Sequence, residues 1–106
     1  MDLSNNMLTQ LASEGASSFL SNMTNLKYLD LSSNTLTALT GSQLFSSVTL
    51  LQTLYLSTNQ LSVLDPGLFA SLTNLQTLGL NSNQLSVLDN PQLFASLTTL
   101  QTLGLT

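Results

Sequence analysis

Three stretches of this 106-residue chain repeat one pattern: LKYLDLSSN at 26–34, LQTLYLSTN at 51–59 and LQTLGLNSN at 75–83. In each of them leucine stands at the first, fourth and sixth positions and asparagine at the ninth. The pattern starts again with LQTLGLT at 100–106, and MDLSNN at 1–6 matches its second half. Self-similarity at a fixed period is typical of stacked, equivalent units, so the sequence predicts a solenoid.

The leucine at the sixth position sets the phase of each repeat. It occurs at 3, 31, 56, 80 and 105, which gives periods of 28, 25, 24 and 25 residues. Residues 1–106 are therefore interpreted as one solenoid segment of about four repeats, with no polar cap sequence at either end. Because soluble repeat proteins need such caps, we expect the segment either to continue into further repeats or to stack end to end with other copies.

Alternation of leucine with polar residues predicts one short strand in each repeat, with the leucines facing inward. Parallel strands need a long crossover, and the rest of each period supplies it. The crossovers are expected to hold short turns or 3₁₀ helix, because Asp65-Pro66 and Asn90-Pro91 combine an N-cap residue with a helix-starting proline. Strands are expected near residues 1–4, 27–32, 53–57, 77–81 and 102–105.

Two further columns of residues recur once per repeat. A buried asparagine amide can satisfy turn backbone groups in its own repeat and in the next, so the asparagines are interpreted as a structural ladder. The phenylalanines are interpreted as a spine that no repeat can bury alone, which makes the stack cooperative. The asparagine ladder consists of Asn6, Asn34, Asn59 and Asn83. The phenylalanine spine consists of Phe45, Phe69 and Phe94.

The composition excludes several classes of function. Only 6% of residues are charged, against about a quarter in a typical domain. With one Lys and a net charge of −4, the chain lacks the clustered cations that nucleic acid requires. No apolar run approaches the roughly 18 to 20 residues of a membrane span, so no membrane insertion is expected. The chain contains no Cys and no His, so we expect neither an enzyme nor a cofactor.

The outward positions of the strands are the candidate contact surface. They can be side-chain ladders that only solvate the sheet, or they can contact a ligand. The second interpretation centres on Tyr28 and Tyr55, because tyrosine is enriched at interfaces. Asp2 is expected beside Asp30, but two carboxylates are too few for a calcium site, so no metal is predicted. The candidate ligand-binding residues are Lys27, Tyr28, Asp30, Gln52, Thr53, Tyr55, Gln76 and Thr77.

The full pattern, LxxLxLxxNxLxxLxxxxFxxLxx, runs from Leu3 to Leu105 and resembles the typical 24-residue class of leucine-rich repeats. That class occurs mainly in extracellular recognition proteins such as Toll-like receptors, small leucine-rich proteoglycans and variable lymphocyte receptors. The resemblance implies an α/β-type leucine-rich repeat solenoid with a curved parallel β-sheet on its concave face. It also implies an extracellular or cell-surface location. The sequon Asn22-Met23-Thr24, a possible N-glycosylation site, is consistent with that location.

Three functions are compatible with these observations. The first is a non-enzymatic binding module that recognises a protein or glycan through the concave sheet of a larger extracellular protein. The second is a structural unit that assembles with other copies of itself, head to tail or into a fibre. The third is ice or crystal-surface binding, suggested by the regular threonine columns. A curved sheet matches a flat lattice poorly, so the third is the least favoured.

Overall fold

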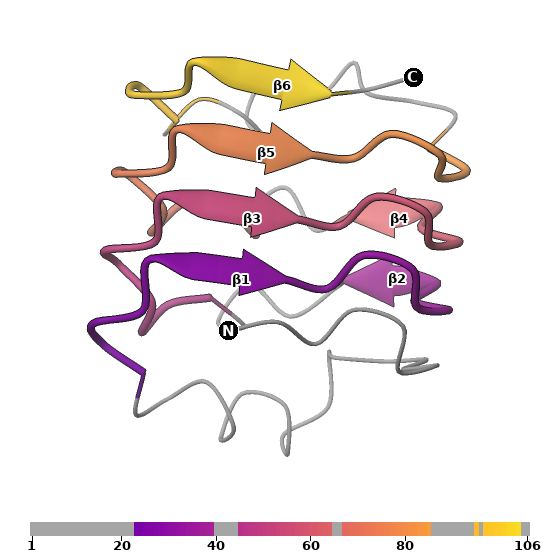
Figure 1. Ribbon diagram of the computed structural model, residues 1–106, viewed down its shortest axis with the longest axis horizontal. Helices are drawn as coiled ribbons and strands as arrows, with labels where there is room; N and C mark the ends of the chain where they lie inside the picture. The colour runs from indigo at the N-terminus through magenta and orange to yellow at the C-terminus, as the bar shows by residue number, and fades with distance from the viewer. Residues whose placement is uncertain (1–22, 40–44, 65–66, 86–94, 96, 105–106) are drawn as a thin grey trace.

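One parallel strand from each repeat contributes to a four-stranded sheet. The computed structural model describes residues 23–39, 45–64, 67–85, 95 and 97–104. Within this part of the chain the sheet order follows the chain order (Figure 1). The predicted parallel sheet with one strand per repeat is thus confirmed. The strands are β1 (Tyr28–Asp30), β3 (Thr53–Tyr55), β5 (Thr77–Gly79) and β6 (Thr102–Gly104).

The strands pair without any slip between repeats. Leu29 pairs with Leu54, and Leu78 pairs with Leu54 and with Leu103. Backbone hydrogen bonds continue past the strand ends, for example from Leu31 N to the Tyr55 carbonyl oxygen at 2.8 Å. The unequal sequence periods therefore do not disturb the sheet.

The strands are three residues long and so shorter than the ranges expected from the sequence. The chain leaves the sheet soon after each strand, at a residue in the left-handed region: Ser33 (φ 57°), Thr58 (φ 56°) and Ser82 (φ 60°). A left-handed residue cannot continue a strand, so β1, β3 and β5 cannot extend through these positions. The strand expected near residues 1–4 lies outside the described residues.

A second, smaller sheet occurs in the crossovers and was not predicted. Strand β2 (Ala38–Leu39) pairs in parallel with β4 (Val63–Leu64). In Figure 1 both run in the direction opposite to β1 and β3. Two hydrogen bonds lead into the pair, from Gln60 N to the Leu36 oxygen and from Ser62 N to the Thr37 oxygen. The crossover is thus tied to its neighbour by backbone hydrogen bonds as well as by packing.

Short turns close the rest of each described crossover, as the sequence predicted for this side. Val48 N donates to the Phe45 oxygen at 3.3 Å, and Leu72 N donates to the Phe69 oxygen at 3.0 Å. These are four-residue turns, and the described residues include no helix. The Asp65-Pro66 and Asn90-Pro91 pairs lie outside the described residues.

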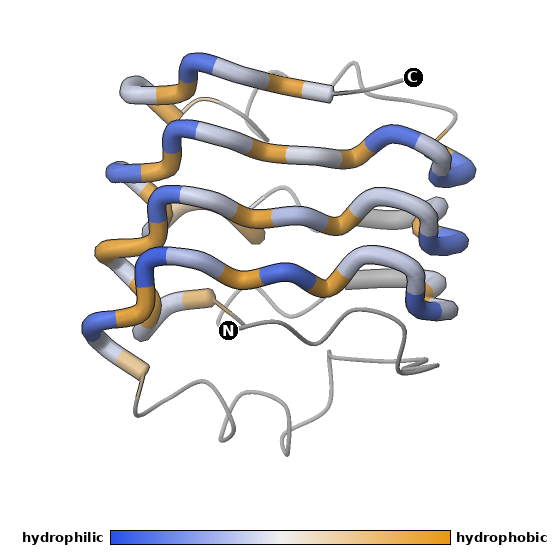
Figure 2. Tube along the Cα trace, viewed as in Figure 1, coloured by the Kyte–Doolittle hydropathy of each residue, from blue (hydrophilic) through white to orange (hydrophobic). Residues whose placement is uncertain are grey.

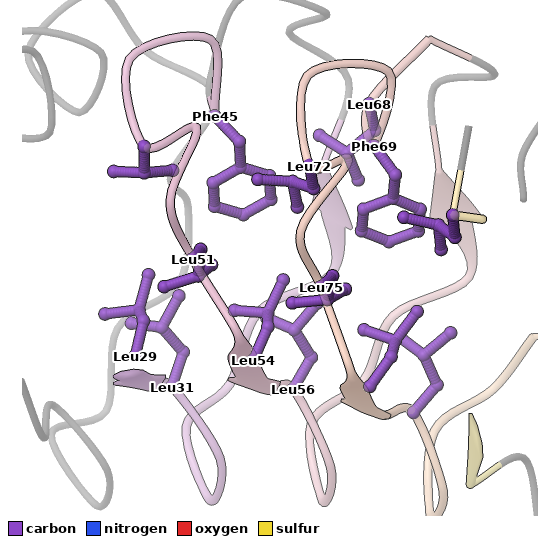
Figure 3. Close-up of a cluster of buried hydrophobic side chains, with 14 of the residues drawn as sticks. Leu29, Leu31, Phe45, Leu51, Leu54, Leu56, Leu68, Phe69, Leu72 and Leu75 are labelled. Atoms are coloured by element: carbon purple, nitrogen blue, oxygen red, sulfur yellow. The ribbon is translucent and has the colours of Figure 1, made fainter. Parts of the chain in front are cut away.

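The core lies between the sheet and these turns. The Phe45 and Phe69 rings stack in parallel, with centroids 6.5 Å apart and planes 7° from parallel. Leucines from the strands fill the space beneath the rings (Figure 3). Phe94, the third predicted member of the spine, lies outside the described residues. The residues that are at most 1% exposed are Leu29, Leu31, Leu36, Phe45, Val48, Leu51, Leu54, Leu56, Leu61, Leu68, Phe69, Leu72, Leu75, Leu78 and Leu80.

The asparagine side chains join consecutive repeats by hydrogen bonds. The Asn59 Nδ2 donates to the Leu56 oxygen in its own repeat at 3.0 Å and to the Leu31 oxygen in the preceding repeat at 3.1 Å. The Asn59 Oδ1 accepts from Leu36 N of the preceding repeat at 3.1 Å. Asn83 makes the equivalent three contacts, and Asn34 donates to the Leu31 oxygen at 2.9 Å. Asn6 lies outside the described residues.

Thr58→Asn is expected to raise the free energy of unfolding by about 1 kcal/mol. Thr58 is exposed and β-branched, yet it holds φ 56°, a conformation that asparagine adopts more readily. Urea unfolding followed by circular dichroism measures the change. Thr73→Asn is the matched control, because Thr73 is exposed and does not hold a positive φ. An equal gain in both variants would show that φ is not the cause.

Candidate ligand-binding surface

The outward side chains of the four strands form a continuous surface, here called the sheet face. Because side chains alternate along a strand, burial of Leu29, Leu54 and Leu78 turns their neighbours outward. Figure 2 shows the alternation of hydrophobic and paler positions along the four rows. The sheet face consists of Tyr28, Asp30, Thr53, Tyr55, Thr77, Gly79, Thr102 and Gly104.

The two tyrosines of the chain meet on the sheet face. Their rings lie edge to face, with centroids 6.0 Å apart and planes at 74°. Tyr28 is 42% exposed, the largest exposure among the large hydrophobic side chains of the described residues. Edge-to-face rings restrict one another, so this pair is a rigid, accessible contact area of the kind common at protein interfaces.

Asp30 lies beside the tyrosine pair and is held by its own strand end. Its Oδ1 accepts hydrogen bonds from the Ser32 backbone N–H at 2.9 Å and from the Ser32 hydroxyl at 2.5 Å. Its Oδ2 accepts a longer bond, 3.4 Å, from the Tyr28 hydroxyl. Asp30 also pairs in register with Tyr55 on the next strand. The carboxylate is therefore held by Ser32 and lies next to the Tyr28 hydroxyl.

The positions in register with Asp30 and Tyr55 on the next two strands, β5 and β6, are glycines, Gly79 and Gly104. A Cβ added at Gly79 would lie 2.8 Å from the Ser57 Oγ and 3.0 Å from the Tyr55 Cδ1, so the Tyr55 ring covers this glycine. A Cβ at Gly104 would lie 3.2 Å from the Asn81 Oδ1. The Ser57 hydroxyl donates to that same Asn81 oxygen at 2.6 Å. Side chains thus lean across neighbouring repeats, and repeat spacing alone does not reveal these contacts.

The remaining candidate residues line the start of the strands. The backbone carbonyls of Lys27, Gln52 and Gln76 each accept two N–H groups from the next repeat, at 2.8 and 3.0 Å. Lys27 is exposed, and in the described part of the chain no hydrogen bond or ion pair joins its ammonium to Asp30. Thr53 and Thr77 pair in register and are half-buried. The structure therefore brings Tyr28, Asp30 and Tyr55 together and leaves Lys27 apart.

Charge is confined to one end of the sheet face. Among the described residues, only Lys27 and Asp30 carry a charged side chain. The same residues contain no group of three His, Cys, Asp or Glu side chains that could hold a metal ion. They also contain no helix that is long and apolar enough to cross a bilayer. Asp2 and the possible glycosylation site Asn22 lie outside the described residues.

Gly79→Ala is expected to push the Tyr55 ring away from its place and to weaken the tyrosine band in near-ultraviolet circular dichroism. The added methyl would clash with the Ser57 Oγ at 2.8 Å and press on the Tyr55 Cδ1 at 3.0 Å, and the ring can turn away from it. The chain has two Tyr and no Trp, so the band reports on this pair. Gly104→Ala is the control, because its Cβ would meet Asn81 instead. An unchanged band in Gly79→Ala would contradict the described contact.

Comparisons with known proteins agree with the repeat structure. A family model described as leucine rich repeat matches residues 49–106, and a second leucine-rich repeat model matches residues 25–47. A chain in the solved structure of the Toll–Spatzle complex of Drosophila, in its glycosylated form, is similar to this protein with a TM-score of 0.82 and 36% sequence identity. That similarity covers 98% of this chain and 15% of the other. Comparison with curated protein sequences gives no match.

The matched models and the strand order describe the same unit. The segment 25–47 contains strand β1 of the four-stranded sheet, and the segment 49–106 contains β3, β5 and β6. The leucine-rich repeat is a non-catalytic repeat fold, in line with the absence of Cys and His from the sequence. The chain belongs to the leucine-rich repeat family.

Proposed function

We propose that this chain is a recognition module, which binds a protein or glycan ligand through the sheet face as part of an extracellular or cell-surface protein. The observation that carries the proposal is the cluster of Tyr28, Asp30 and Tyr55. It is the one place on the described sheet face where aromatic and charged side chains meet. Binding energy in interfaces concentrates in such rigid aromatic anchors.

Similarity to Toll supports this proposal. The matching chain belongs to a complex of Toll with Spatzle, so a protein with this repeat architecture is found bound to another. The form described there is glycosylated, which favours an extracellular location for this chain also. This chain spans 15% of the length of that relative.

Binding to an array of purified extracellular proteins and neutral glycans tests the proposal. Both tyrosines lie on the sheet face. A double variant with Tyr28→Ser and Tyr55→Ser is therefore expected to weaken the binding of any ligand found on the array by more than about tenfold. Gln60→Ala is the control, because Gln60 is exposed and lies on the crossover side. Circular dichroism confirms that both variants fold. Binding that survives in the double variant, or is lost in the control, would contradict the proposal.

A second candidate function, end-to-end assembly of copies of this chain, rests on one observation. Leu103 occupies the same register position as Leu29, Leu54 and Leu78, yet it is 38% exposed where they are fully buried. A further repeat stacked on β6, whether from the same polypeptide or from another copy, would cover it. Sedimentation velocity distinguishes the two: assembly requires a mass that grows with concentration and a Leu103→Asn variant that stays smaller. A monomer at every concentration would exclude assembly.

A further inference from the structure

The two oxygens of the Asp30 carboxylate differ in their hydrogen bonds to the protein. Oδ1 accepts two short hydrogen bonds from Ser32, at 2.9 and 2.5 Å. Oδ2 accepts only the 3.4 Å bond from the Tyr28 hydroxyl, which is close to the limit for such an interaction. Within the described residues no cation pairs with this group. Oδ2 is therefore placed to accept a stronger hydrogen bond from outside the chain.

Two aromatic rings lie on the same part of the sheet face as that oxygen. The exposed Tyr28 ring extends along the strand toward Asp30, as its hydroxyl contact shows. The Tyr55 ring meets Tyr28 at 74°, and Tyr55 is the cross-strand partner of Asp30. The faces of both rings carry negative electrostatic potential, which adds to that of the carboxylate. The site therefore favours a cation with a flat, weakly hydrated surface.

We propose that Tyr28, Asp30 and Tyr55 form a receptor site for an arginine side chain of a protein ligand. The inference rests on the proposed function and names the ligand class. A guanidinium group can stack on the Tyr28 ring while an N–H donates to the Asp30 Oδ2. Lysine fits less well, because its ammonium is compact, strongly hydrated and cannot stack. A neutral sugar can donate a hydroxyl to the carboxylate but carries no positive charge to match it.

Substitution of Lys27 tests the proposal with an expected effect opposite in sign to that of substituting Asp30. Lys27 is the only cation of the chain and it lies one residue before Tyr28, so its charge opposes an incoming guanidinium. The same position holds glutamine in the following repeats, namely Gln52, Gln76 and Gln101. Lys27→Gln is therefore compatible with the fold and is expected to tighten arginine binding by about twofold. Asp30→Asn is expected to weaken it by at least about fivefold, because it removes the charge that accepts the guanidinium.

Titration of the ¹⁵N-labelled chain with capped tripeptides tests the site directly. The probes are acetyl-Gly-Arg-Gly-amide, its lysine counterpart and its citrulline counterpart, which keeps the shape of arginine without the charge. We expect saturable shifts of the Ser32 amide, which donates to Asp30, with millimolar affinity for the arginine probe. The lysine probe is expected to bind more weakly, and the citrulline probe to cause no saturable shift. Asp30→Asn should abolish the difference between arginine and citrulline.

Several outcomes would overturn the proposal. Equal binding of the citrulline probe, retained arginine binding in Asp30→Asn, or no saturable shift with any probe would each exclude a guanidinium site. A neutral disaccharide that shifts the same amides more strongly would identify a glycan site instead. If the arginine probe does not bind but a ligand from the array still binds through the sheet face, only the assignment of an arginine site is wrong. If the arginine probe does not bind and no ligand from the array binds through the sheet face, the proposed function is wrong as well.

Discussion

Phe69→Ala is expected to lower the free energy of unfolding by about 3 to 5 kcal/mol. Phe69 is fully buried and stacks on Phe45 of the preceding repeat, so its removal leaves a cavity at a contact between repeats. Folded domains of this kind are stable by only about 5 to 15 kcal/mol, so the change removes a large part of the total. Because each repeat is stable only through its neighbours, the loss is expected to affect the whole stack.

Urea unfolding monitored by circular dichroism measures this loss. Ala70→Ser is the control, because Ala70 follows Phe69 and is exposed. A loss below about 1 kcal/mol in Phe69→Ala would show that the rings do not support the stack.

Asn59→Ala is expected to lower the free energy of unfolding by about 3 kcal/mol, although it removes only a few atoms. The Asn59 amide accepts from the Leu36 N–H and donates to the Leu31 and Leu56 carbonyls. Without the amide these backbone groups stay buried and lose that hydrogen bond, which costs more than the bonds themselves contribute. Because the lost bonds reach two repeats, the cooperativity of unfolding should fall as well.

Asn74→Ala is the matched control for this change. The Asn74 amide is exposed and donates a single bond, to the Thr49 oxygen at 3.0 Å, so water can replace it. A cost under about 1 kcal/mol is therefore expected. Equal losses in the two variants by thermal unfolding would contradict a special role for the buried column.

The sequence was sufficient to predict the sheet and its register. In the repeats at 51–59 and 75–83 all leucines of LxxLxL are buried, and the spacing of the pattern places Leu29, Leu54 and Leu78 side by side. It did not predict the β2–β4 pair, because two-residue strands such as Val63–Leu64 are too short to show a period. Nor did it predict the left-handed residues, since Thr58 is not a residue type expected at positive φ.

The candidate site was predictable in position and not in detail. Alternation along the strands places Tyr28, Asp30 and Tyr55 on one face, as the sequence indicated. Their interactions depend on side-chain rotamers, which the repeat pattern does not determine. The Ser32 bonds to Asp30 and the Tyr55 ring over Gly79 are examples. Those contacts hold the side chains of the cluster in place, which the sequence pattern alone does not show.

Nitration of tyrosine in a saturated complex is the most direct test of recognition through the sheet face. The two tyrosines of the chain both lie on that face, so mass spectrometry of the modified peptides reports on it without ambiguity. With the strongest ligand from the array bound, we expect the nitration rate of Tyr28, which is 42% exposed in the free chain, to fall by more than about fivefold. An unchanged rate at Tyr28 in the saturated complex would show that the ligand binds elsewhere.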